Sequence, residues 1–363
     1  MKNLKNHAGQ KTKGRNILRS SGKDLYSPAF SHIYIEKGIM NHTESLRILS
    51  RFPRAEIIEI DHYKDIFSRS SQSFVMQKKS PSLILAKKQD NFLYRGAPVC
   101  QDFGNHHFYY ATLVMNCIYD CEYCYLQGMY NSANIVVFVN LDDYFTQVEK
   151  LLQKHPVYLC ISYDTDLLAL EQVLGYVRKW HSFAENNPDL VIEIRTKSAN
   201  FNAIEDLKPL KNVILAWTLS PETVQKNYEH GTPPLRQRIS CIKKALDKGF
   251  RVRICFDPLI YSEDWLSSFK EMVGMTFTEI PADRIADVGI GVFRISRDYL
   301  KRMRKNRPVS AVTQYPYEYD NGVYHYGREL SDSMISSACD IVSEYIPYNN
   351  IYIWKEAESE SNV

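Results

Sequence analysis

The sequence predicts an α/β protein: a partial (β/α)6 TIM-type barrel with a small N-terminal α/β extension and a C-terminal β-hairpin plus helix. Two observations predict this fold class. Short apolar runs rich in β-branched residues alternate with helical patterns, as parallel βα units do. The runs number six, at 108–115, 157–163, 190–197, 213–219, 250–257 and 285–293. Because a closed barrel of this type needs eight, we expect a partial one.

The remaining elements follow from the same periodicities. The helical patterns lie at 141–153, 167–184, 201–207, 235–248 and 265–272. Earlier in the chain, strands are expected at 31–36, 55–61 and 82–87 and a helix at 44–51. No glycine-rich loop follows these strands, so this part is not a nucleotide-binding fold. An additional extended piece is expected at 135–140.

Four segments are expected along the chain. The first 23 residues hold seven Lys and Arg and no acid, so residues 1–24 are expected to form a disordered basic arm. Such an arm serves either as a solubilising tail or as a non-specific phosphate contact. The α/β extension covers residues 25–98, the barrel 99–310, and the C-terminal hairpin and helix 311–363.

Composition restricts the class of protein and its compartment. There is neither a secretory signal nor a run of about 18 apolar residues, which favours a cytoplasmic protein. The eight cysteines are then expected to be thiols or metal ligands rather than disulfides. The net charge of +3 identifies no partner, but 25 tyrosines suit either packing or stacking on bases.

The cysteine motif carries the chemistry. Cys117, Cys121 and Cys124 have C-x3-C-x2-C spacing and follow the end of the first barrel strand, where sites of such folds lie. Zinc would need a fourth ligand, for which His106 or His107 is available. An iron–sulfur cluster is held by closely spaced thiolates, and three of them leave one iron open to a ligand.

At this point the sequence resembles a known family. The segments CEYCYLQGMYNSANIVVFVNLDDYF, YDTDLLALE and NYEHGTPPLRQRI are similar to the spore photoproduct lyase family of the radical S-adenosylmethionine (SAM) superfamily. The resemblance spans roughly residues 30 to 354. It implies a [4Fe-4S] cluster, SAM as cofactor, and DNA containing a methylene-bridged thymine dimer as substrate. It also implies a 5′-deoxyadenosyl radical that takes hydrogen from C6 of the lesion, after which a cysteine returns a hydrogen atom.

The resemblance assigns roles residue by residue. The three cysteines of the motif match the cluster ligands. Tyr123 and Tyr125 match the tyrosines of a radical relay, although both could simply pack around the cluster. The positions matched to SAM contacts are Thr165, Asp166, Lys197, Thr218 and Ser220. Some of these could instead cap a helix, and the turn at 229–232 matches a family turn for which no role is predicted.

The hydrogen donor departs from the family pattern. Tyr163 occupies the position where the well-known members have the donor cysteine. We expect Cys100 to be the relocated donor, because it lies in a polar, aromatic loop without evident need for a core thiol. Tyr163 is then a possible relay partner. Cys160 is the alternative, but alternation along its strand would place it opposite Tyr163.

Two segments are expected to hold DNA. Residues 294–307 include Arg294, Arg297, Lys301 and Arg302 in a basic helix, which could also be an ordinary solvated face. Residues 311–326 predict a hairpin at Asp320-Asn321-Gly322. Arg328 matches an arginine expected to touch the lesion strand. An electron donor of unknown identity is also required.

Two other functions remain open from the sequence. A radical SAM enzyme of the same fold could act on a different substrate, which the missing cysteine at position 163 favours. A non-catalytic DNA-binding protein with a structural metal would instead need four protein ligands.

Overall fold

The structure is a computed structural model that describes residues 29–97 and 100–354. The predicted basic arm at residues 1–24 lies outside the described residues. No helix in the described ranges has both the length and the apolar character needed to cross a membrane.

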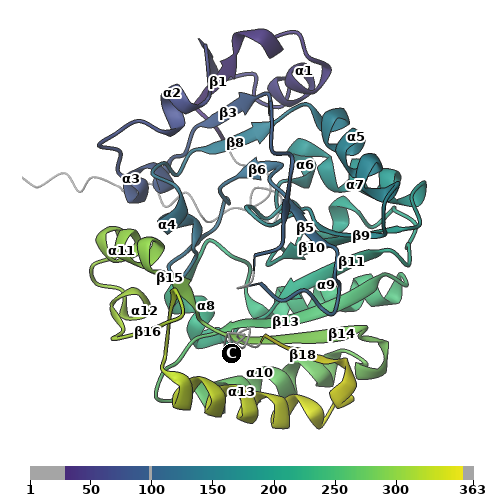
Figure 1. The fold of residues 1–363 in the computed structure, drawn as a ribbon, viewed down its shortest axis with the longest axis vertical. Helices are drawn as coiled ribbons and strands as arrows, with labels where there is room; N and C mark the ends of the chain where they lie inside the picture. The colour runs from purple at the N-terminus through teal and green to yellow at the C-terminus, as the bar shows by residue number, and fades with distance from the viewer. Residues whose placement is uncertain (1–28, 98–99, 355–363) are drawn as a thin grey trace, which may run out of the picture.

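The centre of the molecule is an eight-stranded sheet in the order β18-β14-β13-β11-β10-β9-β5-β4 (Figure 1). The six strands of the predicted series occupy adjacent places in sequence order, and each neighbouring pair among them is parallel. This confirms the partial (β/α)6 TIM-type barrel. The strands are β4 (Leu93–Arg95), β5 (Phe108–Ala111), β9 (Val157–Cys160), β10 (Leu190–Thr196), β11 (Val213–Thr218), β13 (Arg251–Leu259), β14 (Asp287–Val292) and β18 (Ile351–Ile353).

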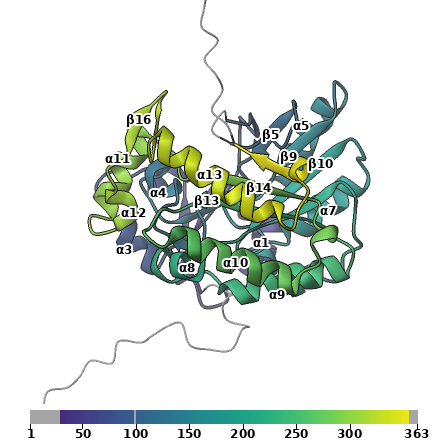
Figure 2. The ribbon, with the colours of Figure 1, turned by 90° about the horizontal axis from the view of Figure 1, so that it is seen from below.

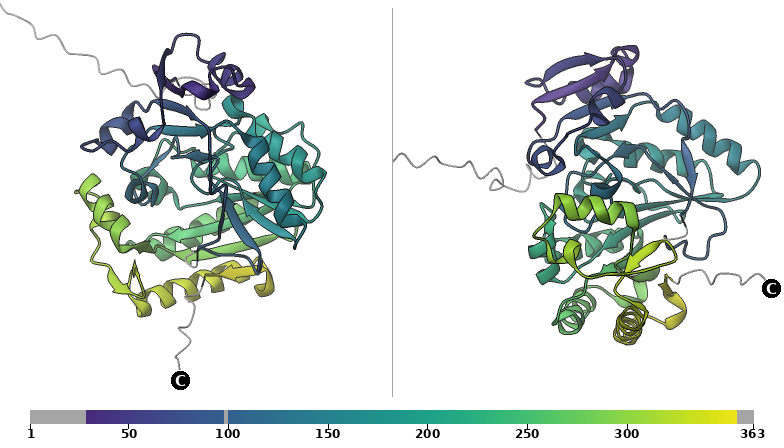
Figure 3. Two further views of the ribbon diagram at one scale, coloured as in Figure 1. Left: turned by 45° about the horizontal axis from the view of Figure 1, so that its top comes forward. Right: turned by 60° about the vertical axis from the view of Figure 1, so that its left-hand side comes forward.

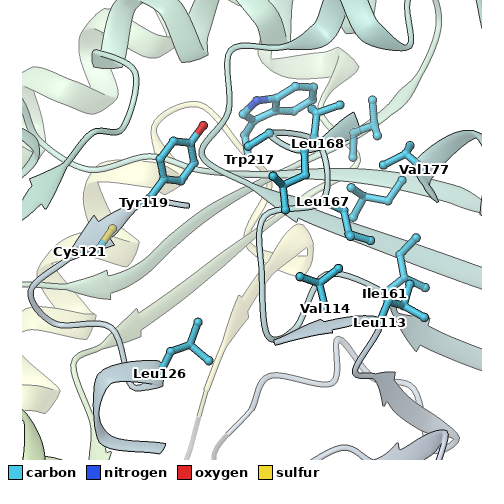
Figure 4. Packing of buried hydrophobic residues seen from close by; sticks show 14 of the residues in the cluster. Leu113, Val114, Tyr119, Cys121, Leu126, Ile161, Leu167, Leu168, Val177 and Trp217 are labelled. Carbon is cyan, nitrogen blue, oxygen red and sulfur yellow. The ribbon is translucent and has the colours of Figure 1, made fainter. Parts of the chain in front are cut away.

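Helices cover the outer face of this curled sheet. α9 (Leu235–Asp247), α10 (Trp265–Glu279) and α13 (Arg328–Ser343) lie side by side along it (Figure 2). α5 (Leu141–Leu152) and α7 (Tyr176–Glu185) cover the strands farther along. The main apolar core fills the space between sheet and helices. Figure 4 shows Trp217 of β11 packed beside Leu167 and Leu168.

The inner face of the sheet carries a smaller, partly polar core. Arg253 donates hydrogen bonds to Asp287 and Glu193, and the Tyr158 hydroxyl also donates to Glu193. Buried charges are tolerated only when paired in this way. Tyr158, Arg253 and Asp287 lie in the amino-terminal halves of their strands, and Glu193 lies at the middle of β10. The network therefore fills that part of the inner face and leaves the carboxyl ends for a site.

The N-terminal extension is a mixed sheet that borrows strands from later in the chain. Its order is β2-β1-β3-β8-β6, with bounds β1 (His32–Glu36), β2 (Glu56–Ile60), β3 (Leu83–Ala86), β6 (Val114–Met115) and β8 (Ile135–Phe138). Its first three strand pairs are parallel, and β6 pairs antiparallel with β8. The predicted single strand at 108–115 is therefore wrong, since β5 and β6 belong to different sheets. Between them, the Thr112 hydroxyl donates to Asp164 at 2.6 Å, and the Thr112 carbonyl accepts from Tyr144. These bonds hold the chain at the crossing, and the segment division at residue 98 stays a prediction.

Three helical expectations differ from the structure. The pattern at 167–184 is interrupted by Gly175 at a φ of 62°, which separates α6 (Glu171–Leu174) from α7. The pattern at 201–207 yields only a 3-10 turn, Phe201–Ala203. α8 (Glu222–Tyr228) was not predicted, because Val224 is its one buried residue and its periodicity is weak.

The C-terminal part confirms the hairpin. β16 (Glu318–Asp320) and β17 (Val323–His325) pair antiparallel across Asn321 and Gly322, whose φ values of 44° and 88° suit a two-residue turn of type I′. Its predicted start is wrong, because Ala311–Gln314 forms α12. β15 (Ile295–Ser296) adds to β17, and α11 (Arg297–Asn306) packs beside both (Figure 3).

Candidate active site

The cysteine loop is held by a two-residue bridge to a distant turn. β7 (Asp120–Cys121) pairs antiparallel with β12 (Glu229–His230), and the Glu122 amide donates to the Tyr228 carbonyl at 2.8 Å. The loop then enters the short helix α4 (Leu126–Met129). The turn at 229–232, for which the sequence predicted no role, is therefore a direct partner of the cysteine motif.

The N-terminal extension also reaches this loop. The ammonium of Lys78, in α3 (Phe74–Lys79), donates a hydrogen bond to the Cys117 carbonyl. Gln77 accepts from the Ala133 amide at 2.9 Å. The sequence did not indicate these contacts, because Lys78 lies 39 residues before its partner and in a different sheet unit.

All three cysteines of the motif are free thiols. Burial raises the pKa of each thiol, to about 12 for Cys117, and the charges of Cys117 and Cys124 also raise the pKa of Cys121. Among the described residues, no three His, Cys, Asp or Glu side chains are already arranged as a metal site. The donor set nevertheless fits an iron–sulfur cluster, whose positive iron would offset the cost of buried thiolates.

Four groups converge on the buried carboxylate of Glu229. The Tyr123 hydroxyl and the Arg238 guanidinium donate to it, Ser220 donates at 2.7 Å, and the Lys197 ammonium lies 3.8 Å away. Burial alone would raise the pKa of Glu229, but Arg238 and Lys197 hold it at about 2. The carboxylate is therefore ionised, and one net positive charge remains on this group.

The other residues predicted to contact SAM differ in whether their polar groups already have hydrogen-bond partners within the protein. Thr165 has a buried hydroxyl without a hydrogen-bond partner among the described residues, so it is free to bind a ligand. Asp166 is already occupied, because it accepts from the Thr196 hydroxyl at 2.8 Å and the Lys197 amide at 2.7 Å. The Thr218 carbonyl accepts from Arg238 at 3.2 Å.

The predicted donor and relay residues are brought together. The Cys100 sulfur lies 3.1 Å from the Tyr163 hydroxyl oxygen, at hydrogen-bond distance. The Tyr125 hydroxyl donates to the Tyr163 carbonyl at 2.8 Å and lies 3.2 Å from the Asp164 carboxylate. The rings of Tyr125 and Tyr163 have centroids 5.7 Å apart. Contacts therefore run without a break from Cys100 to the cysteine loop.

Cys160 lies on the same inner face as these residues. It is 1% exposed, and burial raises the pKa of its thiol to about 12. Cys100 and Tyr163 both pack against its cluster. The predicted opposition of Cys160 and Tyr163 is wrong, because β9 ends at Cys160 and Tyr163 lies in a turn where strand alternation no longer applies.

A tyrosine stack beside Tyr163 was not predicted. Tyr110 stacks on Tyr163 with ring centroids 4.1 Å apart and planes at 24°, and Tyr94 stacks on Tyr110 at 5.1 Å and 17°. Burial raises the pKa of Tyr110 to about 12. The aromatic run at 108–110 is the sequence signal for this stack, although its pattern predicts only a strand.

Of the residues predicted to contact DNA, four are exposed and one, Arg294, is not. Arg297, Lys301 and Arg302 are exposed on α11, although Arg302 also donates to the Met129 carbonyl at 3.1 Å. Arg328 is exposed and pairs with Asp320. Arg294 does not fit the prediction, because its guanidinium is 3.2 Å from Asp257 and lies over the Trp354 ring.

The zinc alternative finds no fourth ligand in the histidine pair. His107 stacks on His155 with centroids 3.7 Å apart. It precedes β5, whereas the cysteines follow the carboxyl end of that strand. His106 and His107 therefore lie at the opposite end of β5 from the chain segment that leads into the cysteine loop.

Sequence comparison places these features in a family. The model of the spore photoproduct lyase family matches residues 105–329. The spore photoproduct lyase of Clostridium acetobutylicum is 21% identical over 318 residues, which cover 84% of this chain and 90% of that protein. The Bacillus subtilis spore photoproduct lyase is 20% identical over 226 residues, covering 61% of this chain and 65% of that protein.

Solved structures share the fold at low sequence identity. A spore photoproduct lyase complexed with dinucleoside spore photoproduct has a TM-score of 0.76 and 16% identity, covering 90% of this chain and 98% of that one. A spore photoproduct lyase mutant with bound AdoMet and dinucleoside spore photoproduct has a TM-score of 0.75 and 16% identity, covering 91% of this chain and 99% of that one. Because the family match spans more than half of the sequence, the chain belongs to the spore photoproduct lyase family.

Proposed function

We propose that this protein is a DNA repair lyase that reverts spore photoproduct, the methylene-bridged thymine dimer, to two thymines by radical SAM chemistry. The observation that carries the proposal is the 3.1 Å contact between Cys100 and Tyr163. This pair is linked through Tyr125 to the three-cysteine loop, in a chain that belongs to the spore photoproduct lyase family. Two similar proteins of known structure are named as complexes with dinucleoside spore photoproduct, which supports the substrate.

Cofactor binding is assigned to this chain's own residues. Cys117, Cys121 and Cys124 would hold a [4Fe-4S] cluster. Lys197, whose ammonium belongs to a group with net positive charge, would bind the SAM carboxylate, and Thr165 has an unused hydroxyl. The cluster and SAM together supply a 5′-deoxyadenosyl radical, and the protein positions the reactants and excludes side reactions.

Cys100 would deliver the hydrogen atom that completes repair. Its S–H bond breaks as a C–H bond forms on the thymine radical, which leaves a sulfur radical on Cys100. The Tyr163 hydroxyl is placed to return a hydrogen atom, so that an O–H bond breaks and the S–H bond reforms. Tyr125 contacts Tyr163, and Tyr123 lies two residues before it in the cysteine loop. These tyrosines would carry the radical onward, each O–H bond reforming as the next one breaks, until a C–H bond of 5′-deoxyadenosine breaks to reform the last O–H bond.

Duplex DNA would be held by the exposed cations near the hairpin. Arg297, Lys301 and Arg302 are suited to phosphates and fix register without reading sequence. The lesion must leave the base stack, which costs a few kcal/mol and less at a damaged pair. An electron donor is needed as a further partner. The proposal includes a cytoplasmic site of action, inside the spore or forespore.

The test is repair of a defined lesion. The protein is reconstituted anaerobically with iron and sulfide and incubated with SAM, dithionite and a duplex oligonucleotide that carries spore photoproduct. We expect two thymines to be recovered for each lesion, and no recovery with Cys121→Ala. SAM cleavage without thymine recovery would favour a different substrate. A colourless, zinc-loaded protein with no SAM cleavage would overturn the proposal.

A further inference from the structure

The two oxygens of the Glu229 carboxylate have different partners. Oε2 accepts from the fully buried Arg238 and lies 3.5 Å from the Thr232 hydroxyl, within its own turn. Oε1 accepts from Tyr123 and from Ser220 at 2.7 Å, and it is the oxygen 3.8 Å from Lys197. One oxygen therefore serves the fold, and the other faces the residues proposed to bind SAM and relay the radical.

We propose that Glu229 is a positioning residue that ties the Tyr123 hydroxyl and the Lys197 ammonium to one oxygen, so that SAM binding and radical return depend on the same contact. This inference rests on the proposed function and goes beyond it. It gives a role to the turn at 229–232, which the proposed function leaves unused.

The chemistry of the contact requires a carboxylate. An ionised carboxylate accepts hydrogen bonds at about four lone-pair positions and donates none, so it can satisfy two hydroxyls and two cations together. A glutamine would offer one accepting oxygen and would place an NH2 group against a cation. Hydrogen bonds to a charged acceptor are also shorter and stronger than neutral ones.

The geometry explains why Lys197 and Tyr123 are coupled. The Lys197 ammonium lies over the Tyr123 ring, 5.5 Å from its centroid, as well as near Glu229. If the Tyr123 hydroxyl is removed, Oε1 loses a donor and becomes a stronger partner for Lys197. The ammonium is then drawn inward, away from an incoming carboxylate. A change at Tyr123 should therefore weaken SAM binding through Lys197, which the substitution leaves chemically unchanged.

Glu229→Asp is the primary variant. It keeps the charge opposite Arg238 but is one methylene shorter, so it cannot span both Arg238 and Tyr123. Lys226→Ala is the matched control, because Lys226 is exposed on α8 just before the same turn and donates to Glu222 at 3.1 Å. Reconstituted holoenzyme is used, and two quantities are measured: the SAM Kd, and 5′-deoxyadenosine released per lesion repaired.

We expect Glu229→Asp to raise the SAM Kd by about tenfold, because the Lys197 ammonium loses the ion-pair partner that fixes its position. It should also raise the deoxyadenosine released per repair above the wild-type ratio, and Lys226→Ala should change neither. In the Tyr123→Phe background, Glu229→Asp should add nothing to that ratio, because it acts through Tyr123. A wild-type SAM Kd and ratio in Glu229→Asp would overturn the inference while leaving the proposed function intact.

Tyr123→Phe provides a second test that leaves the buried Arg238–Glu229 pair in place. It remains informative if the Glu229 variant does not fold. A raised SAM Kd in Tyr123→Phe supports the coupling. A SAM Kd equal to that of the wild type would refute it, whatever happens to repair. If the wild-type protein itself fails to repair the lesion, the proposed function fails first, and the two failures are distinguishable.

Discussion

The sulfur of Cys100 and the hydroxyl of Tyr163 lie 3.1 Å apart, although 63 residues separate them in the chain. From the sequence, Tyr163 is expected to stand where the family pattern has its donor cysteine. The contact is the one that a donor thiol relocated to the loop before β5 would make, and the relocation itself stays a prediction. Both side chains remain in contact with the inner cluster of the barrel.

Cys100→Ala should separate the final step of repair from the earlier ones. Cluster assembly and SAM cleavage should be unchanged, because within the described part of the chain Cys100 contacts Tyr163 and the inner cluster rather than the cysteine loop or the Glu229 group. Thymine recovery should fall by about tenfold or more, equivalent to at least about 1.4 kcal/mol between the productive and by-product routes. Chromatography of the products should show trapped thymine by-products. Cys160→Ala is the control, and by-products from that variant alone would reassign the donor.

Tyr163→Phe tests whether the Tyr163 hydroxyl, which contacts the Cys100 sulfur, returns a hydrogen atom to the Cys100 sulfur radical. The variant keeps the ring stacked on Tyr110 but removes the hydroxyl that Cys100 contacts. We expect thymine to be recovered at the first turnover while more SAM is consumed per lesion, measured as deoxyadenosine per repair. Tyr110→Phe is the control, because it removes a hydroxyl from the same stack but leaves the Tyr163 hydroxyl in contact with Cys100. Equal SAM consumption in both variants would remove Tyr163 from the relay.

Neutralising α11 should weaken DNA binding without changing its sequence preference. Lys301 and Lys305 are exposed, and they face no acid on the helix except Asp298. The double variant Lys301→Ala/Lys305→Ala should lower affinity for every duplex and reduce the salt slope of log K by about 2 if both contact phosphate. Lys243→Ala/Lys244→Ala on α9, which lies elsewhere on the molecule, is the control (Figure 1). An unchanged slope would remove α11 from the DNA surface.

Glu171 gives a pH-dependent contribution to stability that is independent of the cysteine site. Burial raises the pKa of this carboxyl from 4.5 to about 7, although it accepts the Val177 and Arg178 amides. Because the folded protein binds the Glu171 proton more tightly than the unfolded chain does, the contribution of Glu171 to stability is fully present below pH 4.5. It is lost as the pH rises through the folded-state pKa of about 7.

Urea unfolding of the metal-free protein measures this contribution. Relative to Glu171→Gln, the wild-type free energy of unfolding should fall by roughly 3 kcal/mol across that window, at about 1.4 kcal/mol per pH unit. A difference between the two proteins that does not vary with pH would contradict the raised pKa.

The barrel could be predicted because its signals are local. Each strand of the series is a short apolar run, and each is followed by a helical pattern, so order and direction follow from known connection rules. The cysteine motif likewise lies within eight consecutive residues. Cys100 was expected to be the donor because its polar loop shows no evident need for a core thiol; the structure packs it against the inner cluster beside Tyr163, and its role as donor stays a prediction.

The rest of the site depends on contacts between distant segments. The Glu229 carboxylate meets Tyr123 across 106 residues, and Lys78 meets Cys117 across 39. No periodicity reports such pairs. The crossing of β6 and β8 into the N-terminal sheet was missed for the same reason. Arg294 was misjudged because a basic run shows charge but not which guanidinium already has a partner, here Asp257.

The most direct measurement of the central claim is repair carried out in D2O. A cysteine S–H exchanges with solvent, so a hydrogen atom delivered by Cys100 carries deuterium. Mass spectrometry of the recovered thymine should then find one deuterium in one thymine of each pair for the wild type, and little recovered thymine for Cys100→Ala. Recovery of equally labelled thymine from Cys100→Ala, or no thymine from the wild type, would contradict the account.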